Sequence, residues 1–519
     1  MKHMRKLASL LLALVMVFAL ATTAFAAVSN VITIDESGTK HVYEVYQLLT
    51  GTYDSETKEL TNINWGSNVS SDKNAAEEFA DVTADTTISV STSAKTVTIG
   101  EKTYQLTGDV YGTITYVDGE YTLTGVDDGY YVILDVSGSI AGEDDAYSAG
   151  VVRVAGGSVT VTPKSATPSV DKQVHDETTD AEANAVDGWG ETADHAIYEV
   201  YQYKLIANLP NDADLDDYDH YYLQFVDNIS TGVSCLGNFK VYVNDTQITD
   251  FTVSDNAQNT SQDYPLDGAA EFTVTIQDVK THITDLKGAT VTVVYDAWLN
   301  PACAVGNVDT NRNKVSLKYS NNPEWNGTGT PETGETGPDY VFTFTYDVKN
   351  TKIDGTTNQN LAGAQFKLYS SYDETTKTGS NEISLIYDKG KKAYRPIKSG
   401  ETAAAYLESA EGTGVFNIVG LDAGTYYLVE EKAPTGYNKL EEPIIIVIDA
   451  THSETSATSV SVTFTEKTSN VNNTIKNYNG TTLPETGGIG TTIFYVVGSI
   501  LVIGAAVLLV TKKRMSAEG

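Results

Sequence analysis

Apolar and polar residues alternate along short segments through most of the chain, and turn-forming residues separate these segments. Runs such as TKHVYEVYQLLTGTY (39–53), AIYEVYQYKLI (196–206) and ATVTVVYDAWL (289–299) show the two-residue period of β-strands. The segment NAAEEFADV (74–82) is the one good candidate for a short helix. The pattern therefore predicts an all-β chain.

Two linkers divide this pattern into about three domains. Pro163 and Pro168 bracket the first linker, and a stretch rich in Gly, Pro and Thr (321–339) forms the second. Three all-β modules in a row fit an elongated rod better than a globule with a deep pocket. We expect domains at 27–164, 165–339 and 340–478, preceded by a signal peptide at 1–26 and followed by a sorting segment at 479–519.

The two ends of the chain carry targeting signals. Basic residues, an apolar core and the small-x-small site Ala24–Ala26 predict a secretory signal peptide. Near the other end, the apolar run Ile493–Val510 is just long enough to span a bilayer as a helix. The basic triplet Lys512–Arg514 follows this run and would stay on the cytoplasmic side of the membrane.

An LPETG motif precedes that apolar run. This order of features resembles the cell-wall sorting signal of Gram-positive surface proteins. The resemblance implies that a sortase thiol attacks the Thr486–Gly487 bond and passes the threonine acyl group to an amine. It also implies a cell-surface protein attached to peptidoglycan. The motif consists of Leu483, Pro484, Glu485, Thr486 and Gly487.

Charge and composition exclude several other functions. The formal net charge of −35 argues against nucleic-acid binding, which needs a basic surface. The seven histidines are scattered, with neither a Ser/His/Asp motif nor a His/Cys cluster at ligand spacing. We therefore expect no metal, no cofactor and no turnover enzyme. Cys235 and Cys303 could form a disulfide or remain two buried thiols, and the sequence leaves both open.

The start of the third predicted domain places a lysine on the inward face of a strand. From Phe342 to Val348 every second residue is apolar, and Lys352 keeps that phase whereas Lys349 does not. An apolar environment drives a buried lysine towards its neutral form, which is a nucleophile. Lys352 is therefore a candidate nucleophile.

A glutamate and an asparagine of the same domain share this inward phase. Leu428 and Glu430 lie on one strand face, and Ile475 and Asn477 on another. Apolar burial favours the protonated form of a carboxyl group, so Glu430 could polarise the Asn477 carbonyl and shuttle protons. Lys352 would then attack and ammonia would leave, which forms an isopeptide bond.

Three stretches of this domain resemble the CnaB-type domain of Gram-positive pilins. They are TKID around Lys352, LAGAQFKLY (361–369) and YYLVEEKAPTGY (426–437), which matches the E-box pattern YxLxExxAPxGY. The resemblance implies an immunoglobulin-like β-sandwich and a Lys352–Asn477 isopeptide bond assisted by Glu430. Four other asparagines lie nearby, and the phase favours Asn477.

The second predicted domain carries a parallel set. PSVDKQV contains Lys172, HYYLQFVDNISTGV contains Asp227, and NRNKVSLKYSNNP contains Asn313. These stretches resemble a CnaA-type (pilin D2) domain, which implies the same three roles for lysine, acid and asparagine. Asn321 shares the phase of Asn313 and remains an alternative. Asp227 could instead be a turn residue that caps a loop.

Lys164 lies in TPKS, just past the last strand of the first predicted domain. In the shaft pilins that the chain resembles, this place holds a motif ending in Tyr-Pro-Lys-Asn, and here Thr162 and Ser165 replace two of its residues. The resemblance implies that a sortase joins the Lys164 amine to Thr486 of the next subunit. Lys40 and Lys102 are available for a crosslink in the first domain, but no acid and amide pattern accompanies them.

Nearly the whole chain resembles a major, shaft-forming pilin made of tandem immunoglobulin-like domains. That resemblance implies a sortase substrate with single-turnover self-crosslinking chemistry. The implied partners are identical subunits, a sortase, tip or base pilins, peptidoglycan and a host surface ligand. The alternative is a monomeric wall-anchored adhesin that binds a host protein or glycan, which would share the sorting signal and crosslinks but would not need Lys164.

Overall fold

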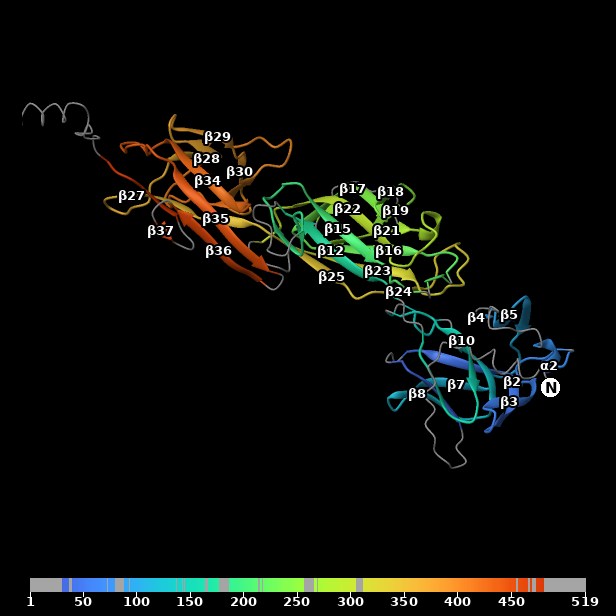
Figure 1. The fold of residues 1–519 in the computed structure, drawn as a ribbon. Coiled ribbons are helices and arrows are strands. Elements are labelled where there is room, and N and C mark those ends of the chain that lie inside the picture. Colours follow the sequence, from blue (N-terminus) through green and yellow to red (C-terminus); the bar gives the residue numbers. More distant parts are fainter. Residues whose placement is uncertain are drawn as a thin grey trace, which may run out of the picture. The chain divides into compact units, whose positions relative to one another are not determined.

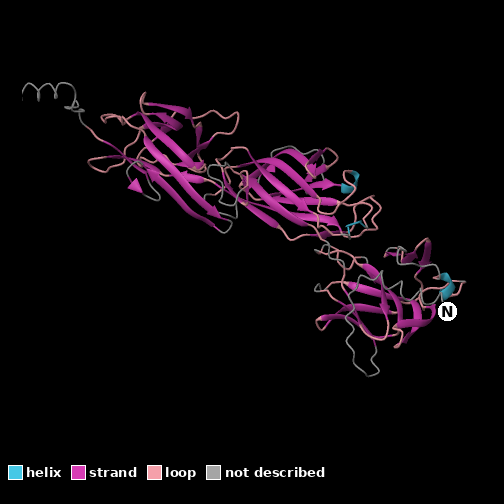
Figure 2. Cartoon of the chain, viewed as in Figure 1, coloured by secondary structure: helices cyan, strands magenta, loops and turns pink. Residues whose placement is uncertain are grey.

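The computed structural model of the chain is built almost wholly of strands (Figures 1 and 2). Strands hold 55% of the residues and helices 2%, which confirms the predicted all-β fold class. The chain forms two compact units: residues 1–345 with 451–459, which contain the first and second domains, and residues 346–450 with 460–519. The structure describes residues 30–36, 40–71, 73–79, 88–92, 94–136, 138–141, 143, 145–163, 167–176, 186–212, 215–216, 218–255, 266–267, 269–304, 311–453, 456–464, 467–468 and 473–479.

The first domain centres on one large sheet in the order β10-β9-β2-β7-β8-β1-β11, with β3 beside β2. A smaller sheet has the order β4-β5-β6. The predicted helix forms a single turn, α2, where the Asn74 side chain accepts a 2.9 Å hydrogen bond from the Ala76 amide. The elements are β1 (Asn30–Ile34), β2 (Val42–Asp54), β3 (Glu59–Trp65), α2 (Ala75–Glu78), β4 (Ile88–Ser91), β5 (Thr96–Ile99), β6 (Lys102–Gln105), β7 (Gly112–Val117), β8 (Glu120–Val126), β9 (Gly129–Asp135), β10 (Ala149–Val154) and β11 (Val159–Val161).

The second domain is a sandwich of two seven-stranded sheets. One sheet has the order β13-β12-β15-β22-β17-β18 with β20 beside β17, and the other has the order β14-β25-β23-β16-β21-β19 with β24 beside β23. The elements are β12 (Ser169–His175), β13 (Trp189–Gly190), β14 (Thr192–Asp194), β15 (Tyr201–Asn208), β16 (Leu223–Ile229), β17 (Val233–Val243), β18 (Thr246–Ile248), β19 (Thr252–Asp255), β20 (Leu266–Asp267), β21 (Ala270–Ile276), η2 (Val279–Thr281), β22 (Thr290–Leu299), β23 (Arg312–Ser320), β24 (Thr333–Glu335) and β25 (Asp339–Phe344).

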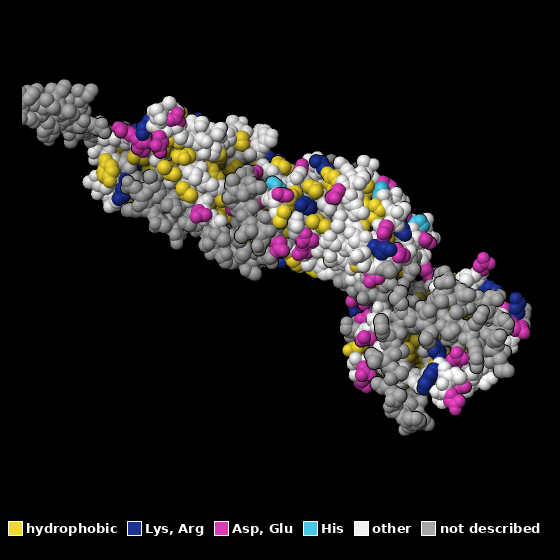
Figure 3. All heavy atoms as spheres, viewed as in Figure 1, with side chains coloured by type: hydrophobic (Ala, Val, Ile, Leu, Met, Phe, Trp, Pro, Cys, Tyr) yellow, Lys and Arg dark blue, Asp and Glu magenta, His cyan; other side chains and the backbone are white. Residues whose placement is uncertain are grey.

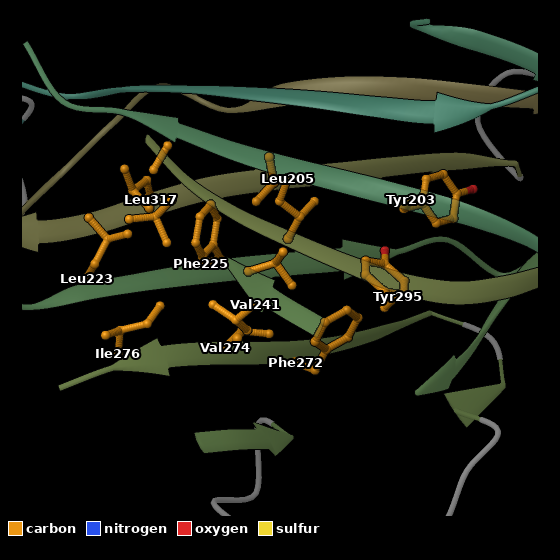
Figure 4. Close-up of a cluster of buried hydrophobic side chains, with 14 of the residues drawn as sticks. Tyr203, Leu205, Leu223, Phe225, Val241, Phe272, Val274, Ile276, Tyr295 and Leu317 are labelled. Carbon is orange, nitrogen blue, oxygen red and sulfur yellow. The ribbon is translucent and has the colours of Figure 1, made fainter. Parts of the chain in front are cut away.

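Apolar side chains from both sheets fill the space between them. Leu205 on β15 and Phe225 on β16 belong to one cluster of fully buried residues (Figure 4). The long strand β22 alternates strictly between partly exposed and buried positions. Its buried residues include Val293, Tyr295, Ala297 and Leu299. This two-residue period brings polar heads as well as apolar groups into the core.

The strand predicted to open the third domain belongs to the second one. β25 pairs antiparallel with β23 and parallel with β14, and it turns Val341 into the core of the second domain. The sequence predicted that Phe342 shares an inward face of the third domain with Val348. That prediction is wrong for Phe342, because the strand that contains it belongs to a sheet of the second domain. The boundary falls after Thr345, six residues later than predicted.

The third domain contains three sheets. They have the orders β26-β33-β31-β30, β27-β38, and β29-β28-β34-β35-β36-β37 with β32 beside β28. The strands are β26 (Tyr346–Val348), β27 (Asn350–Asp354), β28 (Gln365–Asp373), β29 (Thr378–Glu382), β30 (Leu385–Asp388), β31 (Ala393–Pro396), β32 (Leu407–Glu408), β33 (Ile418–Leu421), β34 (Gly424–Lys432), β35 (Ile444–Ser453), β36 (Ser456–Phe464), β37 (Lys467–Thr468) and β38 (Asn473–Asn477).

Several predicted segments lie outside the described residues. They are the signal peptide, Lys164, the LPETG motif and the apolar run 493–510. Among the residues that the structure does describe, there is no helix of the length and apolar character needed to cross a membrane.

Candidate crosslinking sites

Two lysines are buried within the described part of the chain, Lys172 and Lys352, and each side chain is 0% exposed. The two lysines considered for the first domain are different. Lys40 and Lys102 are 59% and 50% exposed and form ion pairs with acidic side chains. A buried amine is therefore a feature of the second and third domains.

Lys172 lies on β12, where alternation turns it into the sandwich. Its Nζ donates a hydrogen bond to Oδ2 of Asp227, which is itself fully buried in the middle of β16. The same Nζ lies 5.2 Å and 5.6 Å from the ring centres of Tyr203 and Tyr295. Asp227 is thus a strand residue that faces the lysine and not a residue that caps a turn.

Asn313 completes this group through a tyrosine. Its Nδ2 donates a 2.6 Å hydrogen bond to Oη of Tyr295, and that hydroxyl donates a 3.1 Å hydrogen bond to Oδ2 of Asp227. Asn321 lies just beyond the other end of β23. At the rise per residue of a strand, it is about 26 Å from Asn313. Of the two asparagines in the same phase, Asn313 is therefore the one that joins the hydrogen-bonded group of Lys172, Asp227 and Tyr295.

Burial drives this lysine and carboxyl towards their neutral forms. It lowers the pKa of Lys172, although Asp227 opposes the shift, and it raises the pKa of Asp227, although Lys172 and Tyr295 oppose that shift. Oδ1 of Asp227 and Oδ1 of Asn313 are buried acceptors without a hydrogen-bond donor. A buried acceptor without a donor is costly, and a proton on the carboxyl would supply one.

In the third domain, Lys352 lies on β27, which is paired with the parallel strand β38. β27 pairs with β38 so that Lys352 faces Ile475 and Asp354 faces Asn477. Nζ of Lys352 is 3.3 Å from the carbonyl oxygen of Ile475 and 3.6 Å from Oε1 of Glu430. Burial lowers the pKa of Lys352 to about 8, although Glu430 opposes the shift.

Glu430 on β34 touches the asparagine directly. Its Oε2 accepts hydrogen bonds from Nδ2 of Asn477 at 2.9 Å and from the Leu440 amide at 2.8 Å, whereas its neighbour Glu431 is exposed. Oε1 of Glu430 and Oδ1 of Asn477 have no donor. The two domains therefore leave the same pair of atoms unsatisfied, one carboxyl oxygen and one amide oxygen.

The other asparagines near Asn477 are placed differently. Asn473 is buried on the same strand, but its Nδ2 donates to Oδ1 of Asn350 at 3.0 Å. Asn479 is exposed, and Asn470 and Asn472 lie outside the described residues.

Sequence reasoning missed Tyr295, although its inward phase on the strand 289–299 was visible. It also missed a buried histidine in the first domain. The ring nitrogens of His41 form hydrogen bonds of 2.6 Å with Asp135 and 2.7 Å with Asp145. Burial alone would lower the pKa of His41, but the two carboxylates outweigh it and raise that pKa to about 10.

In the described part of the first domain, a metal ion at His41 would require that histidine to give up a hydrogen bond. Among the described residues of the first domain, Glu36, His41 and Asp145 offer ligand atoms close together, but both ring nitrogens of His41 are already hydrogen-bonded. Cys235 and Cys303 are both buried and are not joined in a disulfide. Of the two alternatives for the cysteines, the structure contains two buried thiols.

Comparison with known proteins gives two family matches. The family described as a prealbumin-like fold domain matches residues 346–463, and the LPXTG cell wall anchor motif matches residues 475–516. The solved T6 backbone pilin of serotype M6 Streptococcus pyogenes is 15% identical, with a TM-score of 0.49, over 88% of this chain and 100% of that chain.

Two curated relatives cover parts of the chain. The fimbrial subunit type 1 of Actinomyces viscosus is 30% identical over 166 residues, which are 29% of this chain and 28% of that protein. The trypsin-resistant surface T6 protein of Streptococcus pyogenes is 25% identical over 272 residues, 44% of this chain and 49% of that protein. The chain thus matches half or less of the length of these relatives. Residues 346–463 are thus similar to a prealbumin-like fold domain and residues 475–516 to an LPXTG cell wall anchor motif, and the fimbrial and T6 relatives each match only part of the chain.

Proposed function

We propose that the chain is the shaft subunit of a covalent pilus, in which a sortase joins Thr486 of one subunit to Lys164 of the next. The observation that carries the proposal is the repeated buried set of lysine, carboxyl and asparagine in two successive domains of a chain with an LPXTG anchor. A covalently stapled domain suits a fibre that is pulled from its tip.

Each buried set can form one isopeptide bond without a cofactor. Each lysine first loses one proton, in the second domain to the carboxylate that Lys172 touches, and the neutral Nζ then attacks Cγ of the asparagine. The Cγ–Nδ2 bond then breaks, and Nδ2 leaves as ammonia after it receives the proton from the carboxyl group. A second lysine proton then passes to the carboxylate, which ends the reaction protonated, and the third stays as the N–H of the new amide. The sets are Lys172, Asp227 and Asn313, and Lys352, Glu430 and Asn477.

The two bonds would staple the domains in different ways. In the second domain, β12 and β23 belong to opposite sheets, so a Lys172–Asn313 bond would tie the sandwich together. In the third domain, β27 and β38 are neighbours, so a Lys352–Asn477 bond would lock one strand pair. Like a disulfide, each bond would restrict the unfolded chain, which stabilises by about 2–4 kcal/mol.

The proposed partners follow from this assembly. They are identical subunits, a sortase, tip or base pilins, peptidoglycan and a host surface ligand. Acidic side chains are scattered over the face drawn in Figure 3, as the net charge of −35 requires, and such a surface repels nucleic acid. The second candidate function is a monomeric wall-anchored adhesin, which would share the sorting signal and both crosslinks but would not need Lys164.

An immunoblot of boiled, denatured wall extract from producing cells tests the proposal. We expect a high-mass ladder for the wild-type chain and for Lys102→Ala, which removes an exposed lysine of the same domain, and a single monomer band for Lys164→Ala. A single band in all three would favour the adhesin. A ladder that survives Lys164→Ala would keep the pilus but assign the joint to another lysine.

A further inference from the structure

The hydroxyl of Tyr295 stands between two groups that react in the proposed second-domain crosslink. Oη of Tyr295 is 2.6 Å from Nδ2 of Asn313 and 3.1 Å from Oδ2 of Asp227. No hydrogen bond joins Asp227 directly to Asn313 among those the structure gives for these two described residues. The acid therefore reaches the leaving nitrogen of the asparagine through the tyrosine.

We propose that Tyr295 is a catalytic residue of the second domain, which carries the proton from Asp227 to the leaving nitrogen of Asn313. The inference rests on the proposed Lys172–Asn313 bond. A neutral phenol has one proton to donate and lone pairs to accept another, so it can hand one proton on while it receives the next. Burial raises the pKa of Tyr295 well above its ordinary value, which keeps the hydroxyl in that neutral form.

The proton balance closes with the tyrosine unchanged. Lys172 first gives a proton to Asp227, and its Nζ then bonds to Cγ of Asn313. As Nδ2 becomes an amine, Tyr295 gives its hydroxyl proton to Nδ2 and takes the proton of Asp227. The Cγ–Nδ2 bond breaks and ammonia leaves, while the second lysine proton passes to Asp227.

The third domain explains why a relay is needed in one place and not in the other. Oε2 of Glu430 lies 2.9 Å from Nδ2 of Asn477, so that carboxyl can protonate the leaving nitrogen itself. Aspartate is one methylene shorter than glutamate. In the second domain the tyrosine hydroxyl fills the gap that the shorter acid leaves.

The ring of Tyr295 also packs in the core, and the test must distinguish this role from proton transfer by the hydroxyl. Its ring centre lies 5.5 Å from that of Tyr203, 5.4 Å from that of Phe239 and 5.2 Å from that of Phe272 (Figure 4 labels Tyr203, Phe272 and Tyr295). Tyr295→Phe keeps these contacts and removes only the hydroxyl. It therefore tests the proton transfer and leaves the core filled.

The experiment starts from the chain without its signal peptide, synthesised and kept in denaturant so that no bond has formed, and follows ammonia loss by intact mass as the chain folds on dilution. We expect the wild-type chain to lose two ammonia molecules, and Tyr295→Phe to lose the one from the third domain at the normal rate. Loss of the second should slow by about 100-fold or more, the usual contribution of a positioned acid. Tyr319→Phe, which removes another buried hydroxyl of the same sandwich, should behave as the wild type.

A crystal structure of Tyr295→Phe separates chemistry from positioning. The proposal expects Lys172, Asp227 and Asn313 to keep their places with the bond still open. Normal loss of both ammonia molecules, or a displaced Asn313, would overturn the relay. Lys172→Ala tests the underlying bond separately: if it loses as many ammonia molecules as the wild type, the second-domain crosslink itself is wrong.

Discussion

The second and third domains hold the same three kinds of side chain, but they hold them differently. In the second domain the lysine touches its acid directly, and the asparagine meets that acid through a tyrosine. In the third domain the asparagine touches the acid directly, and the lysine Nζ lies 3.6 Å from the acid and 3.3 Å from a backbone carbonyl. The second domain thus makes the direct lysine–acid hydrogen bond, and the third domain makes the direct asparagine–acid hydrogen bond.

For the proposed crosslinks, this difference implies that a buried acid in reach of both partners matters more than one fixed arrangement of strands. The second domain builds its site across two sheets, and the third builds it between two parallel neighbours backed by β34. In both, the surrounding apolar core favours the neutral lysine. The first domain instead buries His41 between the carboxylates of Asp135 and Asp145.

The largest expected effect comes from removal of the acid. Asp227→Asn leaves Lys172 in a fully buried site without a carboxyl, which costs about 3–5 kcal/mol, in addition to the lost crosslink. Glu430→Gln should cost less, because Lys352 keeps its hydrogen bond to the Ile475 carbonyl. Denaturant unfolding gives the stability and intact mass gives the bond count, with each variant retaining one more ammonia molecule than the wild type.

Glu431, the exposed neighbour of Glu430, provides the control for the comparison of the two acid variants. Glu431→Gln should leave both stability and mass unchanged. Equal destabilisation by Asp227→Asn and Glu430→Gln would mean that the carbonyl contact does not support Lys352.

Removal of the asparagines should have a smaller effect. Asn313→Ala and Asn477→Ala abolish one bond each but keep the lysine and its acid, so each should cost about 2–4 kcal/mol. The same mass and unfolding measurements apply. Asn321→Ala is the matched control, since it removes an asparagine of the same strand phase far from Lys172, and ammonia loss in that variant should be complete. If Asn321→Ala retained one more ammonia molecule, the assignment of Asn313 would be wrong.

The smallest effect concerns pH, and it distinguishes the two lysines. The attacking form of Lys352 is neutral and its pKa is about 8, so bond formation in the third domain should rise roughly tenfold per unit up to that pH and level off above it. In the second domain Lys172 can hand its proton to the touching Asp227, so its rate should depend less on pH. Folding of the denatured, uncrosslinked chain in buffers from about pH 6 to pH 9, followed by mass, measures both rates in one chain. Parallel pH profiles would contradict the distinction.

Local alternation was sufficient for much of the fold and for the site of the third domain. Glu430 and Asn477 each follow an apolar residue two positions earlier, Leu428 and Ile475, and Lys352 keeps the phase of Val348. All three are buried. Lys172 and Asp227 came instead from the resemblance to a CnaA-type domain, and both are buried as well. Alternation failed at Phe342, because the period of a strand does not say which sheet the strand joins, and β25 completes the second domain.

The sequence by itself determined which side chains face inward, because in a strand that depends only on the position of a residue relative to its neighbours. Only the tertiary structure decided which inward residues meet. Asn313 and Asn321 have the same phase, and the register of β23 against β16 selects the first. Tyr295 enters the site because β22 lies in the sheet opposite β16 and β23, and Asp135 and Asp145 meet His41 from distant parts of the chain. These contacts depend on the distances between strands, which no local pattern contains.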